Sequence, residues 1–175
     1  MRSALVVYES IFGDAHTIAR AIGDGLAATM PVVVMDAREA PEFLGDEVGL
    51  LVVGGPTHQF GMPRPATRKQ AERSMGAKFP STDRGLREWL HGLQPGNGLP
   101  AAAFDLRMTH PGFLKHVDHA SGQEESLLRQ RGFDVVVPAE HFAVTDTAGP
   151  LADGEVERAR RWGATLAERF AVSRA

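Results

Sequence analysis

Apolar runs alternate with amphipathic segments along the whole chain, a pattern typical of repeated strand–helix units on a parallel sheet. The run over residues 48–54 contains no polar side chain, as expected for a central strand covered on both faces. The predicted strands are Ala4–Glu9, Pro31–Asp36, Val48–Gly54, Leu99–Asp105 and Phe133–Val137. The last of these could continue beyond Pro138 as His141–Thr145.

The segments between these strands predict about five helices. In the first, Ile18, Ile22 and Leu26 recur on one face, which should pack on the sheet. Ser81 or Asp83 is the expected N-cap of the third helix, whose inward side chains would be Leu86, Trp89, Leu90 and Leu93. The stretch over residues 106–123 is predicted to be a long loop. The other helices are predicted over His16–Ala28, Ala66–Met75 (with Thr67 as a possible cap), Glu124–Arg131 and Gly154–Phe170.

The composition fits one globular domain over residues 1–175, with 43% apolar and 23% charged residues. The chain has no cysteine, which excludes disulfides, thiolate nucleophiles, cysteine zinc sites and iron–sulfur clusters. Redox chemistry would therefore depend on a bound cofactor.

The charge pattern favours small-molecule chemistry over nucleic-acid or membrane binding. Nineteen basic and 22 acidic side chains give a net charge of −3, without the strongly basic face that nucleic acids require. We find neither a signal-peptide pattern nor an apolar run that would cross a bilayer, so the expected location is cytoplasmic. The Gly-x-Ser-x-Gly, Walker and Gly-x-Gly-x-x-Gly patterns are also missing.

Candidate chemistry lies in three loops at the carboxyl ends of the strands. In a doubly wound sheet of order 2-1-3-4-5, ligands bind where the strand order reverses, between strands one and three. Residues 10–15, 55–65 and 105–119 would meet there. In the first loop, backbone amides and the helix dipole make an anion site, and Gly13 permits a tight turn. Taken alone, this loop could equally be a plain strand–helix turn with Ser10 as cap.

The combined motifs are more specific than any single loop. They are Val6-Val7-Tyr8-Glu9-Ser10-x-Phe12-Gly13, Gly54-Gly55-Pro56-Thr57-His58-x-x-Gly61-Met62, Phe104-Asp105-x-Arg107, Gly149-Pro150-Leu151, Gly154-Glu155 and Arg158-Ala159-x-x-Trp162-Gly163. In this order and spacing, the chain resembles a bacterial flavodoxin-like family over nearly its whole length. The resemblance implies an α/β three-layer flavodoxin-like sandwich, in which helices cover both faces of a five-stranded parallel sheet of order 2-1-3-4-5. It also implies non-covalent FMN and electron transfer or quinone-type reduction by the flavin.

The resemblance assigns a role to each loop. The loop that would cradle the FMN phosphate consists of Ser10, Ile11, Phe12, Gly13, Asp14 and Ala15. One side of the isoalloxazine would be lined by Pro56, Thr57, His58 and Gly61, and its other edge would be approached by Asp105, Leu106 and Arg107. The flavin would perform the chemistry, with no side chain as nucleophile or general acid. A redox partner protein or a small-molecule acceptor is expected, while the oligomeric state is not predicted.

The chain departs from the family pattern at Asp14 and Ala15, where close relatives have Asn and Thr. Ala15 lacks a hydroxyl that would donate to phosphate, and Asp14 places a carboxylate beside a dianion. His16, if protonated, would partly offset this charge, or it is a solvated residue of the first turn. Two hypotheses follow: an FMN-dependent flavoprotein, or a binding or regulatory domain of flavodoxin fold that has lost or weakened FMN binding.

Three further groups of polar residues have simpler interpretations. His110, His116, Asp118 and His119 are irregularly spaced, so we interpret them as polar loop residues and predict no metal site. Arg64 and Arg68 form structural ion pairs or hold an anionic substrate or a reduced flavin. The last helix carries a basic run, which we interpret as a solvated face paired with acidic residues of the same helix. The basic residues are Arg158, Arg160, Arg161 and Arg169, and the acidic ones are Glu155, Glu157 and Glu168.

Overall fold

The computed structural model describes residues 2–56, 62–76, 83–108 and 121–172. The strands are β1 (Ser3–Tyr8), β2 (Val32–Asp36), β3 (Val48–Pro56), β4 (Pro100–Met108), β5 (Asp134–Val135) and β6 (Glu140–Val144). The helices are α1 (Asp14–Leu26), α2 (Pro65–Met75), α3 (Leu86–Gly92), α4 (Ser121–Gln130) and α5 (Glu155–Val172).

The strands form one parallel sheet in the order β2-β1-β3-β4-β5, which confirms the predicted order 2-1-3-4-5. The fifth position is filled by two short strands rather than by one. β5 pairs with the start of β4, and β6 pairs with its end, from Phe104 to Met108. Pro138 lies between β5 and β6 and has no amide hydrogen to donate to the ladder, which explains the interruption.

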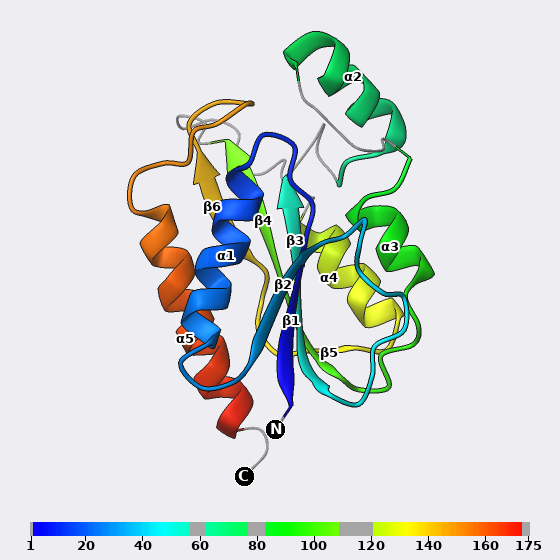
Figure 1. Ribbon diagram of the computed structural model, residues 1–175, viewed down its shortest axis with the longest axis vertical. Helices are drawn as coiled ribbons and strands as arrows, with labels where there is room; N and C mark the ends of the chain where they lie inside the picture. The colour runs from blue at the N-terminus through cyan, green and yellow to red at the C-terminus, as the bar shows by residue number, and fades with distance from the viewer. Residues whose placement is uncertain (1, 57–61, 77–82, 109–120, 173–175) are drawn as a thin grey trace.

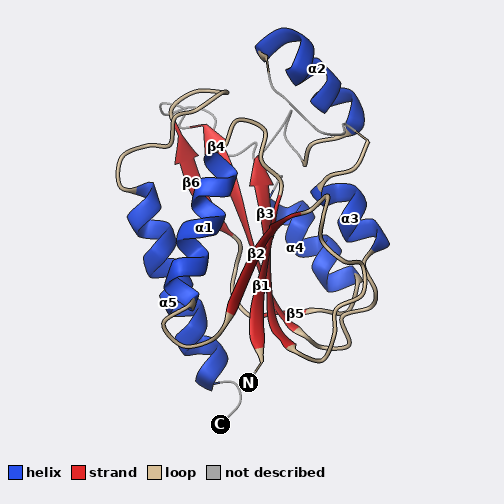
Figure 2. Cartoon of the chain, in the orientation of Figure 1, coloured by secondary structure: helices blue, strands red, loops and turns tan. Residues whose placement is uncertain are grey.

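Helices cover both faces of the sheet, as predicted (Figure 2). Side chains alternate along each strand, so one set packs on α1 and α5 while the other packs on α3 and α4. The first set includes Val6, Val52, Ala102 and Phe104; the second includes Val7, Val53, Ala101 and Ala103. Both sets are nearly inaccessible to solvent, as expected for a parallel sheet.

Helices α1 and α5 approach each other closely at two glycines. A Cβ on Gly25 would lie 2.1 Å from the Arg160 carbonyl oxygen, and one on Gly163 would lie 2.2 Å from that of Ile22. Only a residue without a side chain permits this distance between the helices. The contact fixes the position of α1, whose first residues line the pocket described below.

Helix α2 lies apart from both layers, beyond the carboxyl ends of the strands (Figure 1). Thr67 is its third residue rather than its cap: the Thr67 hydroxyl oxygen accepts the Arg64 amide at 2.8 Å.

Helix α3 begins after Gly85, whose amide donates to Glu88 Oε2 at 3.0 Å, so Asp83 is not the cap. Ser81 lies outside the described residues. No helix in the described part of the chain is long and apolar enough to span a bilayer.

Candidate functional site

A pocket of about 460 Å³, including its open mouth, lies at the carboxyl ends of β1, β3, β4 and β6. The lining is mostly apolar and consists of Ser10, Ile11, Phe12, Asp14, Ala15, Pro56, Leu106, Met108, Val144 and Thr147. The pocket therefore occupies the place where the strand order reverses, as the sequence predicts.

Seven of these lining residues belong to the predicted set, and Gly13 lies within the same β1–α1 loop. The predicted residues Thr57, His58 and Gly61 lie outside the described part of the chain. Met108, Val144 and Thr147 were missed by the sequence prediction. The continuation of the apolar pattern after Pro138 was the one available signal for Val144.

The β1–α1 loop uses its own hydroxyl groups to hold its shape. The Gly13 amide donates to Ser10 Oγ at 3.0 Å, and Thr17 Oγ1 donates to the Gly13 carbonyl at 3.2 Å. Gly13 has φ of 104°, a conformation that favours glycine. No side chain in the described ranges caps α1, so the first amides of the helix and the positive end of its dipole face this loop.

Asp14 is the only ionisable residue in the described lining of the pocket. Its carboxylate also contacts the β6–α5 loop: a Cβ on Gly149 would lie 2.2 Å from Asp14 Oδ2. Partial burial raises the pKa of Asp14 above its ordinary value, and no cation in the described part of the chain offsets that effect. Ala15 beside it is buried and offers no hydroxyl.

His16 packs on the end of β1 rather than in the pocket lining. Its ring stacks on Tyr8, with centroids 5.0 Å apart and planes inclined by 22°. The side chain is exposed and is not among the described lining residues. His16 is therefore a first-turn residue packed on the end of β1, close to the simpler of its two interpretations.

Two of the predicted residues, Asp105 and Arg107, lie on the other face of the sheet. Because side chains alternate along β4, Leu106 and Met108 reach the pocket while Asp105 follows Ala101 and Ala103 toward α3 and α4. Arg107 Nε donates to both carboxylate oxygens of Asp105, at 3.0 and 3.1 Å. The predicted contact of these two residues with a flavin stays a prediction.

Asp105 is the centre of a polar cluster that the sequence did not reveal. Its Oδ1 lies 2.8 Å from Nδ1 of His141 on β6. On α4, Glu124 is buried, and its Oε2 has no hydrogen-bond partner in the described structure. Burial raises the pKa of Glu124 to about 8, and the nearby Asp105 charge adds to this shift. Glu124 is therefore mostly protonated at neutral pH.

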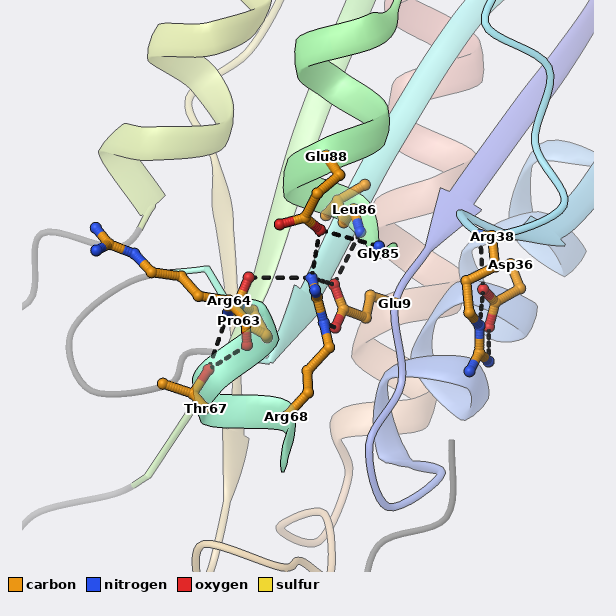
Figure 3. Close-up of polar contacts among 10 residues, drawn as sticks. All are labelled: Glu9, Asp36, Arg38, Pro63, Arg64, Thr67, Arg68, Gly85, Leu86 and Glu88. Atoms are coloured by element: carbon orange, nitrogen blue, oxygen red, sulfur yellow. Dashed lines mark hydrogen bonds and ion pairs between the residues drawn. The ribbon is translucent and has the colours of Figure 1, made fainter. Parts of the chain in front are cut away.

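A second buried network anchors α2 and α3 to the end of β1 (Figure 3). Arg68 Nε donates to Glu9 Oε1 at 2.6 Å, and Arg68 Nη2 lies 2.8 Å from Glu88 Oε2. Glu9 Oε2 also accepts the Leu86 amide at 2.8 Å. A Cβ on Gly85 would come within 2.3 Å of Arg68 Nη2, so this network needs glycine there.

Arg68 is therefore a structural ion-pair residue rather than a substrate anchor, while Arg64 is an exposed residue that precedes α2. On α5, Arg160 pairs with Glu157 at 2.5 Å on the exposed face, as the solvated-face interpretation predicts. Arg158 departs from that prediction: it pairs with Glu155 at 2.6 Å, but it is half-buried and its guanidinium lies 4.5 Å from the centre of the Phe142 ring. The described residues contain no cluster of three metal-ligating side chains. The histidines at 110, 116 and 119 lie outside the described residues.

Comparison with known proteins decides the fold. No protein-family model and no curated sequence matches the chain. Among solved structures, a flavodoxin from the domain Archaea has 20% identity and a TM-score of 0.65, covering 97% of this chain and 99% of the flavodoxin. Oxidised flavodoxin 1 from Bacillus cereus has 16% identity and a TM-score of 0.62, and the match covers 97% of each chain. The chain has the flavodoxin-like fold.

The flavodoxin-like fold also occurs inside a larger protein. The flavodiiron protein from Giardia intestinalis has 19% identity and a TM-score of 0.66, and the match covers 98% of this chain but only 37% of that one. All three structures are distant in sequence, so the likeness concerns the fold. The pocket described above lies at the switch point of this flavodoxin-like sheet.

Replacing Arg68 by Met should lower the free energy of unfolding by about 3–5 kcal/mol, because Glu9 would stay buried without its cation. Urea denaturation would measure the loss. Lys69→Met, on the same helix but exposed, is the control and should change stability by about 0.5 kcal/mol or less. The double change Glu9→Gln with Arg68→Met should recover part of the loss. If Arg68→Met destabilised the protein no more than Lys69→Met does, the network around Glu9 would not be stabilising.

Glu124→Gln should stabilise the protein increasingly as pH rises. The folded-state pKa of Glu124, about 8, exceeds the ordinary 4.5, so its contribution is fully present below pH 4.5 and is lost toward pH 8. Relative to the parent, the variant should gain about 1.4 kcal/mol per pH unit in that window. Denaturation at several pH values, with exposed Glu168→Gln as control, measures this. A stability difference independent of pH would show that Glu124 does not titrate as expected.

Proposed function

We propose that the pocket binds a flavin, either the FMN that the fold suggests or its form without the phosphate, and that the protein acts in electron transfer or in flavin-mediated reduction of a small acceptor. The observation that carries this proposal is the place of the pocket. It is an apolar hollow at the switch point of a flavodoxin-like sheet, bordered by the uncapped start of α1. A flavin supplies redox chemistry that a chain without cysteine lacks.

The described residues fit the ring system of a flavin better than they fit the phosphate of FMN. Ile11, Pro56, Leu106 and Met108 offer apolar walls that suit an aromatic ring system or a ribityl chain. The phosphate end fits less well, because Asp14 contributes a carboxylate and Ala15 no donor. The chain's own residues would hold and orient the flavin and keep water from its apolar surface. No side chain is assigned a proton-transfer role.

Asp14 and Ala15 also favour a second candidate function: a binding or regulatory domain of flavodoxin fold in which FMN binding is lost or weakened. In that case the pocket would have no redox role. The two candidates differ in one measurable property, the uptake of added flavin.

Purified protein should quench the fluorescence of added riboflavin or FMN and should gain thermal stability from at least one of them. Thr147→Trp should weaken that flavin at least tenfold, about 1.4 kcal/mol, because Thr147 is an exposed lining residue and indole would fill the mouth. Ala148→Trp, its exposed neighbour outside the described lining, is the matched control and should bind normally.

The absence of binding of either flavin would contradict the redox proposal and would favour the second candidate. Equal weakening by Thr147→Trp and Ala148→Trp would place the flavin elsewhere on the protein. Both variants lie in an exposed loop, so their unfolding temperatures without ligand should match that of the parent.

A further inference from the structure

The polar end of the pocket carries a negative charge where a phosphate would lie. Asp14 is the first residue of α1, so its carboxylate stands at the positive end of the helix dipole. An external anion would use the same end of the helix. The chain thus places its own anion in the region that would otherwise attract a ligand's phosphate.

None of the described lining residues offsets this charge. The lining contains no lysine, arginine or histidine, and His16 stacks on Tyr8. Of the nearby hydroxyls, Thr17 donates to the Gly13 carbonyl, while Ser10 accepts the Gly13 amide and keeps its own hydrogen to donate. A phosphate dianion here would meet a carboxylate without a compensating cation from the described residues.

The β6–α5 loop keeps the Asp14 carboxylate in place. The backbone of Gly149 lies so close that a Cβ there would be 2.2 Å from Asp14 Oδ2. The same loop brings Thr147 into the lining. On that side, the side chain therefore has little room to swing away from an incoming ligand.

A carboxylate at this position selects by hydrogen-bond chemistry as well as by charge. An ionised carboxylate only accepts hydrogen bonds, and a phosphate dianion also only accepts, so the two repel each other without forming a bond. A hydroxyl donates to a carboxylate through a short, charge-assisted bond. The ribityl chain of riboflavin ends in a hydroxyl where FMN carries its phosphate.

We propose that the pocket prefers a flavin ending in a hydroxyl, the riboflavin class, over its phosphate ester, and that Asp14 sets this preference. The inference rests on the proposed flavin function and names the ligand of the same site. It makes Asp14 a specificity-determining residue, while Ala15 lacks one hydroxyl donor that could offset part of the repulsion.

The test compares dissociation constants of riboflavin and FMN at pH 8, where the phosphate is a dianion. The parent protein should bind riboflavin more tightly than FMN. Asp14→Asn should shift the preference toward FMN by at least tenfold, because FMN gains from removal of the repulsion while riboflavin exchanges a charge-assisted bond for a weaker one to the amide oxygen. Asp24→Asn, exposed on the same helix and outside the described lining, removes the same charge and should leave the preference unchanged.

Ionic strength gives a second measurement on the unmodified chain. Salt screens the repulsion, so FMN affinity should rise with salt while riboflavin affinity stays nearly constant. FMN binding more tightly than riboflavin in the parent, or a preference unaffected by Asp14→Asn, would overturn this inference and leave the flavin function standing. If neither flavin binds to either protein, both proposals fall.

Discussion

Both faces of the parallel sheet are buried, and this constraint determines where each polar side chain at its carboxyl edge must go. Neighbouring residues of a strand point to opposite faces, and helices cover each face. At the end of β4, Leu106 and Met108 therefore line the pocket on the α1–α5 side, while Asp105 turns toward α4. A shift of one residue in register would exchange the two sets.

The two sides of the sheet differ in how their carboxylates are compensated at the carboxyl edge. On the α3–α4 side, Glu9 and Asp105 are buried carboxylates, and each is paired with an arginine, which offsets the cost of removing their charges from water. In the described lining of the pocket, the one charge is Asp14, which has no cationic partner among the described residues. An uncompensated carboxylate beside an apolar hollow is a feature of a ligand site more than of a stabilising network.

Much of this arrangement was predictable from local patterns. The strand order, the helical face with Ile18 and Ile22, and the β1–α1 loop depend on periodicity and turn chemistry, which neighbouring residues determine. Met108 was missed because the predicted strand ended at Asp105, whereas β4 continues to Met108. Thr147 was not predictable, because it follows β6, whose pairing with the end of β4 brings it to the pocket.

The same limit explains the other residues that the sequence did not reveal. Glu124 looks like an ordinary helix-surface acid in sequence, and only the packing of α4 on β4 shows that it is buried. Likewise, the stacking of His16 on Tyr8 depends on how α1 meets the end of β1. Three-dimensional packing, rather than local pattern, determines both environments.

The central claim is that a flavin binds between the β1–α1 loop and the ends of β4 and β6. Backbone amide chemical shifts of the labelled full chain, recorded as riboflavin is added, test it most directly. The account predicts the largest changes at Gly13, Asp14, Val144 and Thr147, and none at Trp89, which is buried on the α3–α4 side. Changes concentrated near α3, or no change at saturating flavin, would contradict it.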